Sequence, residues 1–120
     1  VSGPRALDKA KLICNLVWSR LSRRGIGFDK KNTEFIGYNS CHKNLGSLSD
    51  NPSEVVVRIG VMDKSRDKVN EFGKEIAPLI TNGPPGVTGF AGGRPKAQDV
   101  IAYWPALIDK KKIKTKVDAS

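Results

Sequence analysis

The sequence predicts an α+β domain in which helices and strands follow the order α-β-β-α-β-β and pack as a two-layer sandwich. Two stretches repeat apolar residues every three or four positions, as helices do, and other stretches alternate apolar with polar residues, as strands do. Glycine and proline separate these stretches. This order favours a mixed or antiparallel sheet with both helices on one face. The length of 120 residues suits a single domain, residues 1–120.

The first predicted helix covers residues 6–23. Ser2 suits the cap of this helix, and Pro4 suits its first turn, where a missing amide hydrogen costs nothing. Gly25 is expected to end it. Its apolar positions form one wide stripe, which predicts burial along much of the helix: Leu7, Ala10, Ile13, Cys14, Leu16, Val17, Trp18 and Leu21.

Two strands are predicted next, at residues 33–40 and 54–62, because apolar residues alternate in both. The polar residues 41–53 between them are typical of a long loop. One face of the second strand consists of four aliphatic side chains: Val55, Val57, Ile59 and Val61. This strand is therefore expected to cover the core.

A second helix is predicted over residues 66–80, with Asp63 or Ser65 as its cap. Pro78 limits it, since proline removes a backbone donor. Its apolar face consists of Val69, Phe72, Ile76 and Leu79.

The last part of the chain begins with a glycine-rich loop, residues 81–96. A strand is predicted within residues 98–108, where Val100, Ala102 and Trp104 share one face and Pro105 ends the strand or marks a bulge. A final short strand is predicted at residues 112–117.

The composition excludes several classes of protein. Hydrophobic residues make up 38% of the chain, too many for a disordered tail, yet no apolar run reaches the roughly 18–20 residues of a membrane span. Cys14 and Cys41 are too few for a disulfide framework, and His42 is the single histidine, which argues against a zinc site. We expect reduced thiols, a cytoplasmic location, no bound metal and no membrane partner. The sequence assigns no cofactor.

The glycine-rich loop is the strongest candidate site. Glycines let backbone N–H groups approach a ligand, so the loop is interpreted as a ligand-binding or active-site loop, for example for an anion, or as a structural connection or an interface with another domain or subunit. It lacks the lysine and hydroxyl residue of a nucleotide-binding phosphate loop, and it follows a helix rather than a strand. The candidate residues are Asn82, Gly83, Pro84, Gly86, Thr88, Gly89, Gly92, Gly93 and Arg94.

A second candidate is the polar cluster Asn39, Ser40, Cys41 and His42. Cysteine beside histidine resembles a thiolate nucleophile and its base. Neighbouring strand residues point to opposite faces, however, and no third group orients the histidine. A cluster that bonds the backbone at the start of a loop is the favoured interpretation. No complete catalytic set is present, so the sequence does not decide whether the chain is an enzyme.

The formal net charge is +9, from 21 basic and 12 acidic residues. Basic residues gather after the first helix and near the C-terminus, which leaves open a free-standing module that binds an anionic ligand or nucleic acid. Nucleic-acid binders pair such charges with exposed aromatic residues, whereas the aromatic residues here follow core patterns. Nucleic acid is therefore disfavoured as a partner, and a solvated basic face is preferred.

Four stretches of the chain carry a resemblance to a known family: EFIGYNS, EVVVRIG, KEIAPLITNGPPGVTG and GGRPKAQDVIAYWPALI. Together they resemble the acyclic terpene utilisation (AtuA-like) family, in the C-terminal part of its large N-terminal domain. The resemblance covers about residues 6–113. The loop positions that match the family's motif are Asn82, Gly83, Pro84 and Gly86.

This resemblance implies a fragment of a longer catabolic protein. Members of the family are linked to the cytoplasmic degradation of acyclic terpenes, such as citronellol and geraniol, and of branched-chain acyl compounds. It implies no catalytic residues. The partner that it implies is the remainder of the parent protein. A second copy of the chain and a small-molecule ligand are left open as further partners.

Overall fold

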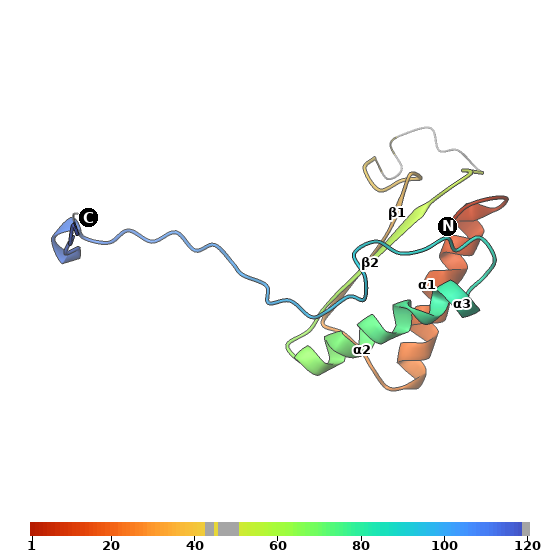
Figure 1. The fold of residues 1–120 in the computed structure, drawn as a ribbon, viewed down its shortest axis with the longest axis horizontal. Coiled ribbons are helices and arrows are strands. Elements are labelled where there is room, and N and C mark those ends of the chain that lie inside the picture. The colour runs from red at the N-terminus through yellow and green to blue at the C-terminus, as the bar shows by residue number, and fades with distance from the viewer. Residues whose placement is uncertain (43–44, 46–50, 119–120) are drawn as a thin grey trace.

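The computed structural model describes residues 1–42, 45 and 51–118. Within them the α+β class is confirmed, because helices accompany a two-stranded antiparallel sheet. The elements in chain order are α1 (Ala6–Arg23), β1 (Lys30–Ile36), β2 (Val56–Met62), α2 (Arg66–Ile76), α3 (Pro78–Asn82) and the 3-10 turn η1 (Lys110–Lys112) (Figure 1).

Helix α1 has the predicted bounds, and its apolar stripe is buried except at Leu16 and Trp18, which are half-buried. The predicted cap is wrong. Arg5 occupies the cap position at φ 58°, and no side chain caps the helix. The Ser2 amide instead donates to the Gly86 carbonyl over 2.8 Å, so Ser2 joins the chain start to a distant loop. Gly25 follows the helix at φ 69°, which confirms it as the stop.

The two strands pair antiparallel, with Thr33 opposite Ile59 and Phe35 opposite Val57. Strand β1 starts and ends earlier than predicted. The backbone turns after Ile36, because Gly37 adopts φ 91° and the amides of the next two residues bond back to the Phe35 carbonyl. Strand β2 begins two residues later than predicted and ends where expected.

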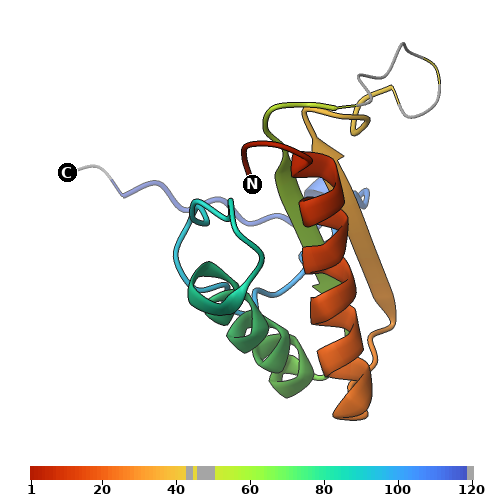
Figure 2. The same ribbon diagram turned by 90° about the vertical axis from the view of Figure 1, so that its right-hand side faces the viewer.

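The core lies between the helices and one face of the sheet. Helix α1 lies over one face of the sheet, and α2 lies next to α1 at an angle to it (Figure 2). The larger buried cluster combines α1, α2 and α3, and Ile59 and Val61 of β2 pack against it. Its buried members are Ile13, Val17, Leu21, Phe72 and Leu79. The alternation that predicted β2 therefore corresponds to one half-buried and one exposed face of the strand.

The second predicted helix is divided into two. Ser65 is its cap and accepts a hydrogen bond from the Lys68 amide, while Asp63 accepts one from the Ser65 amide over 2.8 Å. Helix α2 ends before Ala77, and Pro78 opens the short helix α3. A proline in the first turn of a helix loses no bond, which explains why the chain restarts a helix there.

The two predicted C-terminal strands are wrong for the described part of the chain. Residues 98–108 and 113–117 are exposed and form no strand, and Lys112 belongs to the 3-10 turn η1. The segment leaves the body of the protein (Figure 1). The radius of gyration is accordingly 20.7 Å, against about 14 Å for a compact domain of this length. A strand forms only where a neighbouring backbone accepts its hydrogen bonds, and no described strand lies beside this segment.

Candidate functional site

A groove of about 570 Å³ runs beneath the glycine-rich loop. Residues 56–59 of β2 form one side, and Phe72, Ile76, Leu79 and Ile80 of the helices form the other. Residues 87–91 and Pro95 of the loop also line it. Most of these side chains are apolar, so the groove offers an apolar surface to a hydrocarbon or to another protein segment.

The edge of β2 away from β1 pairs with no strand among the described residues, and we call it the free edge. Four consecutive residues of β2 line the groove. Since side chains alternate between faces, consecutive residues can share one cavity only where the strand presents its edge to it. An unpaired edge offers backbone N–H and C=O groups to a further strand. The groove therefore combines apolar side chains with unpaired backbone.

Gly86 fixes one end of the loop over the chain start. Its carbonyl accepts the Ser2 amide, and the Lys9 Nζ lies 3.4 Å from the Ser2 carbonyl. A Cβ at Gly86 would lie 2.4 Å from the Ser2 carbonyl oxygen, and the residue adopts φ 97°. Both facts demand glycine here. The requirement for glycine at position 86 therefore arises from packing against another part of the same chain.

The other end of the loop is fixed to α2. The side-chain oxygen of Asn70 accepts the Ala97 amide over 3.1 Å, and Arg66 binds Asp99 over 3.0 Å. Gly73 allows this approach, because a Cβ there would lie 2.4 Å from the Pro95 carbonyl oxygen. Sequence reasoning missed Gly73. Its signal was a glycine inside a helical pattern, which often marks close packing.

The remaining candidates in the loop occupy different positions. Thr88 and Gly89 line the groove, whereas Gly92, Gly93 and Arg94 are exposed. Asn82 ends α3 and is exposed. The Gly83 amide donates to the Leu79 carbonyl over 3.0 Å, and Pro84 follows, half-buried. The loop therefore divides into anchors, a groove wall and an exposed turn.

The polar cluster of Asn39, Ser40, Cys41 and His42 lies in the turn after β1, outside the lining of the groove. Cys41 is exposed, with its Sγ 4.0 Å from the Ser40 Oγ. Between Cys41 and His42, both of which the structure describes, there is no hydrogen bond. Three or more potential metal ligands do not cluster anywhere in the described ranges. This geometry brings no catalytic pair together.

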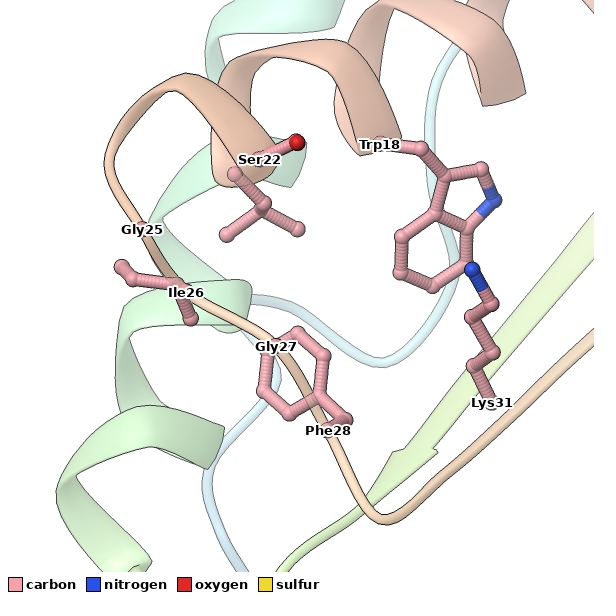
Figure 3. A pocket seen from close by; sticks show the side chains of 8 residues that line it. Trp18, Ser22, Gly25, Ile26, Gly27, Phe28 and Lys31 are labelled. Atoms are coloured by element: carbon pink, nitrogen blue, oxygen red, sulfur yellow. The ribbon is translucent and has the colours of Figure 1, made fainter.

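A second cavity, of about 340 Å³, lies beside the end of α1 (Figure 3). Lys31 reaches over the Trp18 ring, with its Nζ 5.4 Å from the ring centroid. Trp18 stacks on Phe72, and Phe28 meets Phe72 edge-on, both with centroids 6.1 Å apart. These contacts join α1, the following loop and α2. They confirm Trp18 and Phe72 as packing residues.

A charge cluster joins α1 to α2. Glu75 is buried, with Arg20 Nε at 2.7 Å and Arg24 Nη1 at 2.8 Å from its carboxylate oxygens. Arg24 also pairs with Glu71, which pairs with Lys74. Lys74 and Arg24 together hold the pKa of Glu71 below its ordinary value, and the two glutamates raise the pKa of Arg24.

This cluster changes the interpretation of the basic residues after α1. The sequence suggested a solvated face, or at most a nucleic-acid surface. Arg20 and Arg24 are instead committed to carboxylates of α2. Their charge is therefore largely neutralised locally, which weakens the case for a basic binding module.

Comparison with family models gives one match over residues 1–119, to the Acyclic terpene utilisation family protein AtuA. The chain belongs to the AtuA family. Comparisons with curated proteins and with solved structures gave no significant match. Among the described residues of this AtuA-family chain, no helix has both the length and the apolar character needed to cross a membrane.

Proposed function

We propose that this chain is a subdomain of a longer catabolic protein of the AtuA family, which acts in the cytoplasm on acyclic terpenoid or branched-chain acyl compounds. Its glycine-rich loop serves as one wall of a docking interface. Family membership supports the catabolic role. The groove between that loop and the free edge of β2 is the single observation that carries the interface role.

The loop geometry favours an interface over an anion site. The glycine requirement at Gly83 and Gly86 arises from contacts with Leu79 and Ser2 of the same chain. The rim of the groove also exposes large apolar side chains, namely Val56, Ile80 and Phe90. An apolar patch of this kind marks a surface that another segment covers. A further strand at the free edge would complete the predicted two-layer sandwich.

The catabolic role is tested in the host. We expect deletion of the gene to abolish consumption of citronellol while consumption of glucose continues. The intact gene and a Leu12→Glu variant should restore consumption, and Ile80→Glu should not. Leu12 is a matched control because it is exposed on α1 outside the groove lining. Unchanged citronellol consumption after deletion would overturn the catabolic role.

A second candidate function is binding of the terpenoid itself, which the apolar lining of the groove favours. Its volume of about 570 Å³ lies in the range of small-molecule sites. Calorimetric titration with citronellol tests it. Saturable binding that Ile80→Glu removes and Leu12→Glu retains would establish the ligand site. Absence of binding would leave the interface as the function of the groove.

A further inference from the structure

We propose that residues 100–108 form a strand that pairs with the free edge of β2 in a second copy of the chain, so that two copies exchange their C-terminal segments. The inference deepens the interface proposed above and rests on it. It names the partner as a second copy and the docking segment as one strand of that copy.

The proposed donor strand, residues 100–108, exposes large apolar side chains to water. Its six large apolar side chains are each at least 65% exposed: Val100, Ile101, Tyr103, Trp104, Leu107 and Ile108. Water opposes such exposure, and the described part of the chain leaves these side chains uncovered. The backbone of the segment follows an extended course (Figure 1), so pairing would cost little rearrangement. Pro105 is tolerated because the incoming strand becomes a sheet edge.

The acceptor is the groove along β2. A strand laid against the free edge would bond to the backbone of residues 56–62 and place alternate side chains on the apolar wall of α2 and α3. Ile76, Leu79 and Ile80 form that wall. Donor and acceptor therefore match in both respects, since each has unpaired backbone and apolar side chains.

The place where the segment is attached to α2 favours pairing with a second copy of the chain over pairing with the groove of the same chain. Arg66 and Asn70 fix Ala97 and Asp99 at the first turns of α2. Beyond Asp99 the chain runs away from the helices and the sheet (Figure 1). The molecule extends to 65 Å along its longest axis, against 38 and 33 Å along the others. A two-fold pair of such molecules would fill both grooves by reciprocal exchange.

The oligomeric state of the 120-residue chain tests the inference. Sedimentation equilibrium should give twice the mass of one chain. Ala102→Pro removes a backbone N–H from the donor, and Ile80→Glu places a charge on the acceptor. Each should weaken dimerisation at least about tenfold, a loss of about 1.4 kcal/mol in binding. Lys114→Pro is the matched control outside the proposed strand and should leave the dimer intact.

Mixing the two variants separates exchange from a general loss of structure. The Ala102→Pro chain keeps an intact groove, and the Ile80→Glu chain keeps an intact donor strand. An equimolar mixture should therefore form a heterodimer with one exchanged strand, more tightly than either variant dimerises alone. Misfolded variants would not restore each other.

Three results would overturn the exchange. The first is a monomeric chain whose residues 100–108 are protected from amide exchange, which would show docking on its own body. The second is a monomer with an unprotected segment. The third is a dimer that neither variant weakens. If the chain is monomeric while Ile80→Glu still abolishes citronellol consumption, the exchange fails and the proposed interface stands with another partner.

Discussion

Strand β2 and residues 98–104 carry the same alternating pattern, yet only β2 is folded into a sheet. Strand β2 has β1 on one edge and the α1 and α2 cluster on one face. Residues 98–104 pair with no described strand, and although Gln98–Val100 lie near Val61, Met62 and Val69, the large side chains from Val100 onward are mostly exposed. The difference teaches that alternation marks a segment able to form a strand, and that a partner decides whether the strand forms.

The largest expected effect is the loss of stability when a side chain in the folded core is truncated. Leu21 is 1% exposed within the larger core cluster. We expect Leu21→Ala to lower the free energy of unfolding by about 2–5 kcal/mol, through lost transfer energy and a cavity. Val117→Ala, at an exposed C-terminal position, should change it by less than about 0.5 kcal/mol. Urea denaturation measures the free energy of unfolding of both variants. Equal losses would contradict the contrast between the packed core and the exposed C-terminal segment.

A smaller loss of stability is expected at the contact between α2 and the start of the C-terminal segment. Gly73→Ala places a methyl group against the Pro95 carbonyl, so the contact must open despite the better helix propensity of alanine. We expect a cost of about 1–3 kcal/mol and faster amide exchange at Ala97. Gly60→Ala in β2 meets nothing within 4 Å and serves as the control. Unchanged exchange at Ala97 would show that this anchor is not required.

The loss of folding stability at acid pH should depend on the charge cluster that joins α1 to α2. The folded-state pKa of Glu71 is lowered, chiefly by Lys74 and Arg24. Its contribution is therefore complete above the unfolded pKa of about 4.3 and is lost as the pH falls through the depressed value. Asp63 acts in the same direction, since the Ser65 amide lowers its pKa. Thermal unfolding between pH 7 and 2 should show a shallower decline for Glu71→Gln.

The smallest effect concerns the two thiols and leaves stability unchanged. Burial raises the pKa of Cys14, whereas Cys41 is exposed. A thiol reagent at neutral pH should modify Cys41 rapidly and Cys14 only as the body unfolds. Peptide mapping of the labelled chain distinguishes them. Equal labelling rates in native buffer would mean that α1 opens readily.

The sequence predicted the candidate site less well than the fold. The bounds of α1 and the Ser65 cap follow from local spacing and hydrogen bonding, and the structure confirms them. The loop was recognised by its glycines, but its groove was not, because the lining comes from β2, α2, α3 and the loop together. The pairing of Arg24 with Glu75 also spans 51 positions, which no local pattern reveals.

By itself, the sequence determined α1, the start of α2, the β2 pattern and the family motifs, since these depend on residue spacing along the chain. Tertiary structure decided that Gly86 and Gly73 serve packing, that Arg20 and Arg24 are paired, and that residues 98–108 have no partner strand within the described chain. The physical reason is that backbone pairing, close approach and burial of charge all require a second segment. Sequence spacing specifies what each segment can do, and the neighbour in space determines what it does.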